Sequence, residues 1–335
     1  MASERLQPRR FRTALAISIV VAVVVLFLAP LAGPTHIDFA KVAAREGPDF
    51  DVMISLRLPR VLLAMLAGGC LALAGAVFQT LLRDALATPD TLGISSGASL
   101  GAVVAICFNV GRAGNLPVVW VGALAGSVLV LLLVLGIAGA GERMSSFTLL
   151  LAGIAINSMC MALIQFVHSV AAFTQSFSIT RWLMGGIDAV PYPTLAWLAA
   201  LVLPAAAVVL MRAPAWNLLA VGEEWAAARG VAVDRLLFTG YLAASVLTAP
   251  VTAITGPIGF VGLIVPHALR LWLGADHRVL MPCSFLWGAA LLAICDAVAR
   301  VVLAPAEIPA GVITALLGGP FFMWLLRVRK RSIRI

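Results

Sequence analysis

Long runs of apolar residues, separated by short polar segments, follow one another along almost the whole chain. Several runs extend for about 20 residues without a charged side chain, the length that an α-helix needs to cross roughly 30 Å of hydrocarbon. The short segments of alternating polar and apolar residues that are typical of a transmembrane barrel do not occur. The pattern predicts an all-α, polytopic membrane protein, with residues 1–335 forming a single transmembrane domain.

Charge-free windows divide the chain into ten predicted membrane spans. The first six cover residues 13–35, 61–82, 91–111, 117–139, 145–170 and 193–211. The segment 180–193, before the sixth, is broken by two glycines, and we interpret it as a half-crossing helix. The ninth and tenth spans cover residues 279–298 and 309–326.

Residues 236–269 carry no charge, but one helix of that length would be about 51 Å long at 1.5 Å per residue, too long for the bilayer. The sequence TGPIG at 255–259 is expected to break it. We therefore predict a seventh and an eighth span here, the eighth ending near Leu273. A total of ten places both termini on the same side of the membrane.

The charges set the orientation. Only 11% of the residues are charged, against roughly 25% in soluble domains, and the mean hydropathy is +1.06. A net charge of +8 would be typical of a nucleic-acid binder. With ten spans, however, 16 of the 23 Lys and Arg residues share the side of the two termini. The positive-inside rule then places both termini in the cytoplasm, with membrane lipid and no nucleic acid as a partner.

Two further segments follow from this topology. Residues 33–56 are expected to form a polar external loop. The five cysteines lie inside apolar runs without paired spacing, so we expect small core residues and neither disulfides nor a metal site.

The longest cytoplasmic loop, residues 213–232, contains the sequence AVGEEWAAARG at 220–230. Its pattern predicts a short helix, with Glu223 and Glu224 in the first turn, Arg229 in the last turn and Gly230 as the C-terminal cap. The preceding PAWNLLAVG predicts a second short helix that ends at Gly222. From the residues alone, two functions stay open: docking onto a soluble partner, or an inert helix at the membrane surface.

Eight segments, in order, carry a resemblance to a known family. They are RLPR (57–60), ALAGAVFQTLLRDALATPDTLGISSGASLGA (72–102), LLLAGIA (149–155), WLMGGID (182–188), NLLAVGEEWAAARGV (217–231), TGPIGFVGLIVPHALRLWLGADHRVLMP (255–282), DAVAR (296–300) and EIPAGVITALLGGPFFMWLL (307–326). The chain resembles the permease subunits of type II ABC importers, which carry iron chelates (ferric siderophores, haem) and cobalamin into bacteria. The resemblance covers nearly everything after the first span.

This resemblance implies a ten-helix subunit in the bacterial inner membrane, working as a homodimer with the pathway on its two-fold axis. It also implies that residues 213–232 are coupling helices, which contact a cytoplasmic ABC ATPase dimer. The coupling residues would be Asn217, Leu218, Leu219, Gly222, Glu223, Glu224, Trp225 and Arg229. No GxxxxGK[ST] sequence occurs, so ATP and Mg²⁺ are expected on the separate ATPase. We expect this chain to bind no cofactor and to be no enzyme.

Three arginines, Arg57, Arg60 and Arg300, are expected at the external mouth. In the family, arginines at such positions pair with acidic residues of a periplasmic substrate-binding protein, which fits the steering role of rim guanidiniums. The alternative is that they anchor helix ends to lipid headgroups. Asp296 lies one helical turn from Arg300 and is expected to pair with it.

Two cytoplasmic turns, residues 83–93 and 142–148, correspond to the family's cytoplasmic gates. Asp84, Leu86, Ser146 and Phe147 are the gate candidates, and the alternative is that both turns are ordinary connections. Relatives often read Asn-Pro-Leu-Ala where this chain has DALA at 84–87, so the stiffness that a proline gives is missing.

Glycines four residues apart, Gly93, Gly97 and Gly101, predict close packing between membrane helices. A second segment broken by Gly and Pro, TGPIGFVGLIVP, follows five spans later. Five spans reverse the topology, so spans 2–5 and 7–10 are a possible inverted repeat.

His168, near the external end of the fifth span, is a weak candidate for the substrate pathway, where it could ligate haem iron. A polar histidine that caps a helix is the more frequent alternative. TPDTLGISSGASLGA resembles the iron branch of the family, so we favour haem or a ferric siderophore over cobalamin. An ion-coupled transporter would keep ionisable residues inside spans, and Asp296 is the only acid close to that description.

Overall fold

The computed structural model of the chain describes residues 8–33, 38–45, 47–108, 112–113, 116–139 and 145–332. Residues 34–37 and 46 of the predicted external loop lie outside this set, as do residues 142–144 of the second gate turn. A small antiparallel pair of two-residue strands, β1 (Arg112–Ala113) and β2 (Leu116–Pro117), is present among the described residues. Apart from that pair, the regular elements of the described chain are helices.

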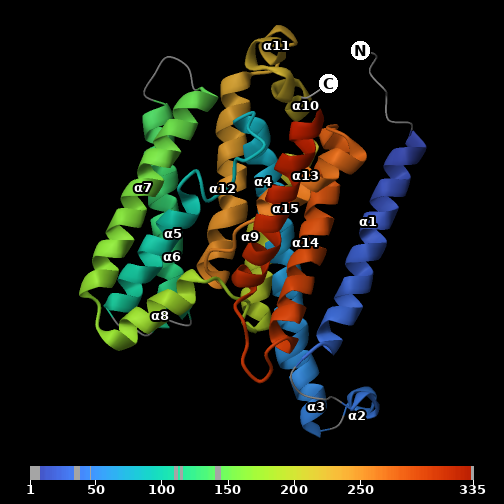
Figure 1. Cartoon of the computed structure of the whole chain (residues 1–335), viewed down its shortest axis with the longest axis vertical. Helices are drawn as coiled ribbons and strands as arrows, with labels where there is room; N and C mark the ends of the chain where they lie inside the picture. Colours follow the sequence, from blue (N-terminus) through green and yellow to red (C-terminus); the bar gives the residue numbers. More distant parts are fainter. Residues whose placement is uncertain are drawn as a thin grey trace.

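Ten apolar helices make up the described part of the bundle (Figure 1). Seven are long enough to cross a membrane: α1 (Pro8–Leu28), α4 (Leu58–Leu81), α6 (Val118–Ala138), α7 (Ser146–Val170), α9 (Tyr192–Met211), α12 (Val233–Thr255) and α14 (His277–Val301). Three have shorter apolar stretches: α5 (Ile94–Cys107), α13 (Val261–Leu273) and α15 (Ala310–Ser332). Their order matches the ten predicted spans, and α12 gives way to α13 at the predicted TGPIG break.

Shorter elements lie at the two ends of this bundle (Figure 1). At one end are α10 (Ala213–Val221) and α11 (Glu223–Ala228), together with the start of α1 and the end of α15. At the other are η1 (Ala29–Leu31), α2 (Phe39–Ala44), α3 (Gly47–Asp51), the π-helix η2 (Val52–Arg57) and α8 (Phe173–Leu183). We refer to these as the α11 end and the α3 end.

The half-crossing helix predicted at 180–193 is misplaced. Helix α8 begins earlier, at Phe173, and ends at Leu183, and the chain then runs without regular structure to α9. Backbone hydrogen bonds to distant segments explain this: Gly186 N–H donates to Thr255 O at 2.8 Å, and Gly185 O accepts from Gly311 N–H at 3.0 Å. Residues 185–186 are thereby fixed to α12 and α15 instead of continuing a helix.

Helix α4 forms the core, and it packs against α14, α12 and α13. Glycines make these contacts close: a Cβ at Gly75 would lie 1.9 Å from Gly262 O, and a Cβ at Gly68 would lie 2.2 Å from Gly288 O. The predicted packing role of Gly97 and Gly101 is also found, because both face the backbone of α6. Small residues thus bring these membrane helices into backbone contact.

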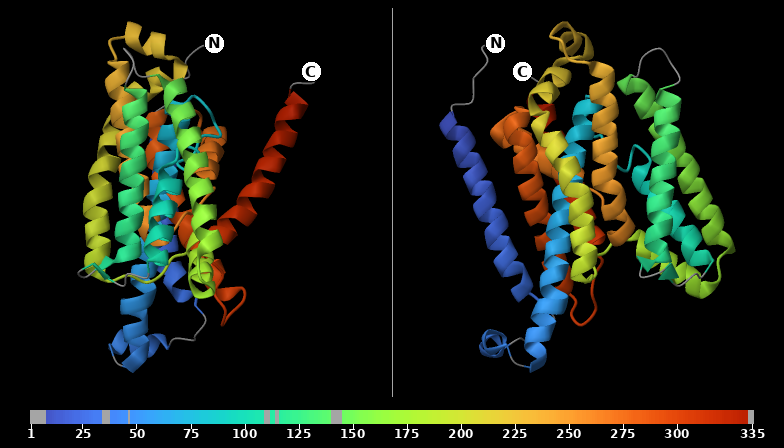
Figure 2. Two further views of the ribbon diagram at one scale, coloured as in Figure 1. Left: turned by 90° about the vertical axis from the view of Figure 1, so that its left-hand side faces the viewer. Right: turned by 180° about the vertical axis from the view of Figure 1, so that it is seen from behind.

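Helices α7 and α15 lie at the periphery of the bundle. Figure 2 shows α15 leaning away from the other helices toward the α11 end. Both helices leave large apolar side chains uncovered, among them Leu316 and Leu317 on α15 and Met159 and Leu163 on α7. Within the described chain, these two helices therefore have apolar surface available for lipid or for another protein.

The two halves of the chain repeat a pattern of helix lengths. Helices α4 to α7 have 24, 14, 21 and 25 residues, and α12 to α15 have 23, 13, 25 and 23. Each short helix follows a residue with left-handed backbone, Gly93 before α5 and Phe260 before α13. This agreement in length and local conformation fits the predicted repeat of spans 2–5 and 7–10.

Candidate functional site

At the α11 end, α10 and α11 present one buried and one exposed face. Trp216 and Leu219 are buried one turn apart on α10, whereas Trp225 on α11 is 61% exposed. The guanidinium of Arg229 lies 5.8 Å from the centre of the Trp225 ring, a cation–π distance. The outward surface of α11 therefore combines an aromatic ring with charged groups, including exposed Glu224.

Trp216 holds α10 against the membrane helices. Its indole Nε1–H donates to Val209 O at 2.9 Å. Its ring fills the space beside Gly240 on α12, where a Cβ would lie 2.6 Å from the ring. A buried tryptophan with a satisfied N–H gives α10 a fixed position relative to α9 and α12.

Asn217 connects α10 to the start of α14. Its side-chain Nδ2 donates to Asp276 Oδ1 at 2.8 Å, and its Oδ1 accepts from the backbone N–H of His277 at 2.8 Å. Because Oδ1 is thereby an acceptor, the His277 ring Nδ1, also at 2.8 Å, carries a proton. The other ring nitrogen, Nε2, lies 2.7 Å from Thr80 Oγ1 in the last turn of α4.

Glu223 connects α11 to both predicted gate turns. Its Oε1 accepts from Ser146 Oγ–H at 2.7 Å, and the same oxygen lies 3.3 Å from Arg83 Nη2. Ser146 is the first residue of α7 and Arg83 follows α4. The sequence placed Glu223 among ATPase contacts and Ser146 among gate residues, and the structure brings these two together.

The other three gate candidates are not joined to Glu223. Asp84 Oδ1 accepts from Leu86 N–H at 2.9 Å, a hydrogen bond within the turn that lacks the proline of the relatives. Leu86 and Phe147 are 58% and 68% exposed. These apolar side chains face outward from the described chain, and their role as gates stays a prediction.

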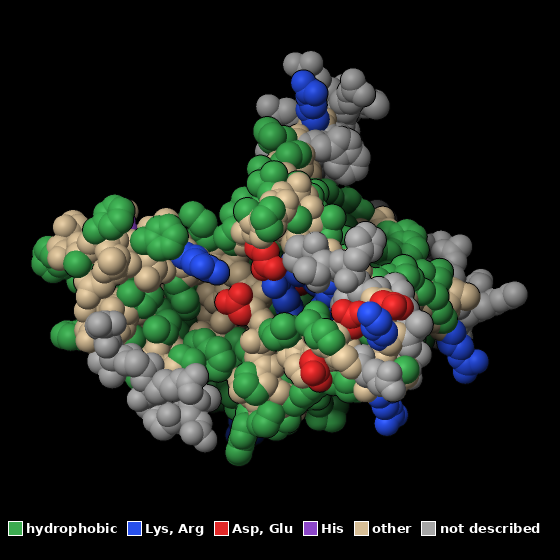
Figure 3. Space-filling view, turned by 90° about the horizontal axis from the view of Figure 1, so that it is seen from below, with side chains coloured by type: hydrophobic (Ala, Val, Ile, Leu, Met, Phe, Trp, Pro, Cys, Tyr) green, Lys and Arg blue, Asp and Glu red, His purple; other side chains and the backbone are tan. Residues whose placement is uncertain are grey.

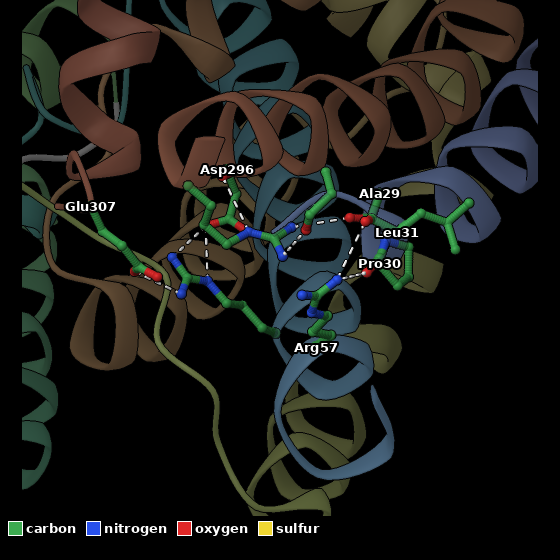
Figure 4. A network of polar contacts seen from close by, with 9 residues as sticks. Ala29, Pro30, Leu31, Arg57, Asp296 and Glu307 are labelled. Atoms are coloured by element: carbon green, nitrogen blue, oxygen red, sulfur yellow. Dashed lines mark hydrogen bonds and ion pairs between the residues drawn. The ribbon is translucent and has the colours of Figure 1, made fainter. Parts of the chain in front are cut away.

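At the α3 end, a chain of charges links α4, α14 and the segment before α15 (Figure 4). Arg60 contacts Asp296 Oδ1 at 3.0 Å and Glu307 Oε2 at 2.9 Å. Arg300 contacts Asp296 Oδ2 at 3.1 Å, the i,i+4 pair that the sequence predicted. Asp296 and Arg300 are both buried, so each charge depends on these partners.

Arg57 and Arg300 also hold the end of α1. Arg57 donates to Pro30 O at 3.2 Å and Leu31 O at 3.3 Å, and Arg300 donates to Ala32 O at 2.8 Å and Ala29 O at 3.2 Å. Both guanidiniums are buried. From the sequence, we expected both guanidiniums at the external rim, available to a partner. In this structure, both donate hydrogen bonds to backbone carbonyl oxygens instead. Their docking role stays a prediction.

A cavity of about 770 Å³ opens at the α3 end, within the size range of small-molecule sites. Its lining includes Arg60, Glu307, Arg181, Asp188 and Trp182. Seen from this end, acidic and basic side chains lie together near the middle of a mostly apolar face (Figure 3). The cavity can therefore receive a bulky molecule that carries both apolar and charged groups.

A second cavity, of about 410 Å³, lies between α5, α7 and the segment before α13. Its polar lining comprises Asp90, Ser95, Ser96, Ser99, Asn157 and Gln165. Asp90 is not among the predicted site residues, because it lies just before a predicted span, whereas helix α5 begins only at Ile94. Burial raises the pKa of the Asp90 carboxyl, and a hydrogen bond with Ser95 partly opposes that shift.

His168 lies at the junction of α7 and α8. Its Nε2 is 2.9 Å from Ser176 Oγ and 3.5 Å from Thr180 Oγ1. In this structure His168 therefore joins the end of α7 to α8 through side-chain hydrogen bonds, and its contact with substrate stays a prediction. Among the described residues, no group of three His, Cys, Asp or Glu side chains comes together to hold a metal ion.

Comparison with known proteins identifies the family. The model of the FecCD transport family matches residues 15–328. The hemin transport system permease protein HmuU of Yersinia pestis is 39% identical over 287 residues, which cover 85% of this chain and 85% of that protein. The cobalamin import system permease protein BtuC of Halobacterium salinarum is 41% identical over 277 residues, which cover 82% and 73%.

A solved structure agrees with these relatives. An ABC transporter described as of metal-chelate type, in an inward-facing conformation, matches with a TM-score of 0.82 and 30% identity, over 95% of this chain and 99% of that one. Family model, relatives and fold each cover more than four fifths of this chain. The chain therefore belongs to the FecCD transport family.

Proposed function

We propose that this chain imports an iron chelate, either haem or a ferric siderophore, across the bacterial inner membrane, as one half of a homodimer. As an ABC permease subunit of its family it is a transport component and not an enzyme. Both termini lie in the cytoplasm, where an ATPase dimer binds α10 and α11. ATP and Mg²⁺ bind to that ATPase, and this chain binds no cofactor.

The observation that carries this proposal is the position of α10 and α11. They stand at one end of the apolar bundle, fixed inward by Trp216 and Asn217, with Trp225 exposed on the outward face. An exposed aromatic ring on a firmly held short helix is suited to bind a groove of another protein. In the proposed assembly, the groove belongs to the ATPase.

The α3 end and the two peripheral helices support contacts with two further proteins. The cavity lined by Arg60, Arg181 and Trp182 opens at the α3 end, and the exposed apolar faces of α7 and α15 lie beside the bundle. We propose that a periplasmic binding protein releases substrate at this end, and that the second copy of the chain packs against α7 and α15. Arg60, which lines the cavity, is then the arginine best placed to meet the binding protein.

Cobalamin is the alternative cargo, since several relatives are cobalamin or vitamin B12 import permeases. An ion-coupled transporter is disfavoured by the position of Asp296, whose charge is buried and paired with Arg60 and Arg300. Uptake into proteoliposomes separates the cargoes, using hemin, a ferric hydroxamate siderophore and cyanocobalamin in parallel. Hemin or siderophore uptake supports the proposal, and uptake of cyanocobalamin alone contradicts it.

The ATPase contact is tested by copurification of the cognate ATPase with the wild type and with Trp225→Ala. Loss of an exposed aromatic anchor should reduce ATPase retention at least about tenfold. Trp197→Ala is the matched control, because Trp197 is 77% exposed but lies on α9, away from α11. Equal retention by all three proteins would exclude α11 as the ATPase site.

A further inference from the structure

Two adjacent glutamates on α11 have different surroundings. Glu224 is exposed, whereas the Glu223 side chain is only 26% exposed and points to other segments of the same chain. One oxygen of Glu223 accepts a short hydrogen bond from Ser146 at 2.7 Å and lies 3.3 Å from the Arg83 guanidinium. A carboxylate that receives both a hydroxyl and a guanidinium binds more strongly than a neutral acceptor would.

These contacts join three segments that the sequence separates widely. Ser146 begins α7, Arg83 follows α4, and Glu223 begins α11. A second connection reaches the same end of α4, from Asn217 on α10 through His277 to Thr80, three residues before Arg83. The α10–α11 segment is therefore attached at two places to the end of α4, and at one of them also to α7.

The turn that Arg83 begins has an unusual backbone. Arg83 has φ of +51°, in the left-handed region that residues other than glycine rarely adopt. Such a conformation persists where surrounding contacts hold it, and Glu223 supplies one of those contacts. Movement of α11 would remove that support from the turn.

We infer that Glu223 is a positioning residue inside the permease, which transmits movement of α10 and α11 to the turns at Arg83 and Ser146, and is not itself a contact of the ATPase. This rests on the proposed function, because the movement is supplied by the ATPase. The α11 surface then has two parts with different contacts. Trp225 faces the ATPase, and Glu223 faces the turns that precede α5 and α7.

The test follows the two turns directly. A single cysteine replaces either Leu86, which is exposed in the turn after Arg83, or Phe147, which is exposed at the start of α7. The rate at which each cysteine reacts with maleimide is measured in the ATPase complex, with and without ATP. Four of the five native cysteines are buried, and Cys107 is partly buried, so a protein with native cysteines only serves as the blank. Each cysteine is combined with Glu223→Gln, Ser146→Ala or Asp234→Asn.

With Glu223 intact, ATP should change the labelling rate at both positions by about fivefold or more. In Glu223→Gln the change should fall below about twofold at both positions, whereas in Ser146→Ala it should fall below about twofold at position 147 only, because the contact of Arg83 with Glu223 remains. ATPase retention should be unchanged in both variants. The double variant should lose no more than Glu223→Gln alone, because that substitution already removes the carboxylate that Ser146 contacts. Asp234→Asn, an exposed acid of α12, is the control and should respond as the wild type does.

Three results would overturn the inference. Glu223→Gln could release the ATPase as Trp225→Ala does, which would make Glu223 a docking residue. The labelling response could be the same with and without Glu223. It could also be absent in the wild-type background although the ATPase is bound. If the wild type binds no ATPase, the proposed function itself is wrong, and this result is distinguishable from the other three.

Discussion

The two ends of the bundle use charged side chains in different ways. At the α3 end, the side chains of Asp296 and Arg300 are 0% and 3% exposed, and their charges are compensated inside the protein. At the α11 end, Arg83 and Glu223 are 46% and 26% exposed and meet at a single oxygen atom. The first arrangement is a buried network, and the second is a contact that water reaches.

This difference in exposure indicates which end of the bundle is an anchor and which end can move. Breaking a buried ion pair leaves a charge without compensation, so the network at the α3 end resists rearrangement. Exposed pairs contribute only about 0.2–1 kcal/mol, so a contact like that of Arg83 and Glu223 can open and reform at small cost. We therefore expect the α3 end to hold α1, α4 and α14 together while the α11 end changes.

The largest effect should follow from Asp296→Asn. It removes the carboxylate between Arg60 and Arg300 and leaves the buried charge of Arg300 without its acidic partner, which should destabilise the protein by about 3–5 kcal/mol. Thermal unfolding of the detergent-solubilised protein measures this. Glu307→Gln is the matched control, because Glu307 binds the same Arg60 but is 41% exposed. Equal stability of Asp296→Asn and the wild type would show that the network is not an anchor.

The sequence was sufficient for the ten membrane helices because each depends on local pattern, whereas the position of α8 was missed. Charge-free runs located the ten spans, and the Gly-Pro sequence located the break between α12 and α13. Glycines four apart predicted a close approach of membrane helices, and the structure shows that α5 makes this contact with α6. The Asp296–Arg300 pair was found because residues one turn apart on a helix are neighbours.

Contacts between distant segments could not be predicted in the same way. Burial of Arg57 depends on where the end of α1 lies, and no local pattern gives that position. The contact of Glu223 with Ser146 joins residues 77 positions apart. Asp90 lines the cavity of about 410 Å³ because the chain turns in the segment before α5, whereas the sequence suggested a regular span from Thr91.

An intermediate effect should follow from Asn217→Leu, which keeps the approximate volume but removes every hydrogen bond of the amide. Asp276 and the backbone of His277 would each lose a partner, which should cost about 1–3 kcal/mol. The loss is local, so hydrogen exchange of α10 and the first turn of α14 should accelerate, while exchange in α4 near Gly68 should not. Unchanged exchange in α10 would show that Trp216 alone fixes this helix.

The smallest effect on stability, and the sharpest test of the comparison, is expected for Arg83→Gln. The pair with Glu223 is exposed, so its loss should lower the free energy of unfolding by less than about 1 kcal/mol. Salt should weaken the wild-type contact in the same way, since exposed charges are screened. The change in labelling rate that ATP causes at position 86 should nevertheless become smaller, because Arg83 is the residue through which Glu223 holds that turn. If Arg83→Gln instead destabilised the protein as strongly as Asp296→Asn, the α11 end would be a second anchor, and movement would have to arise elsewhere in the bundle.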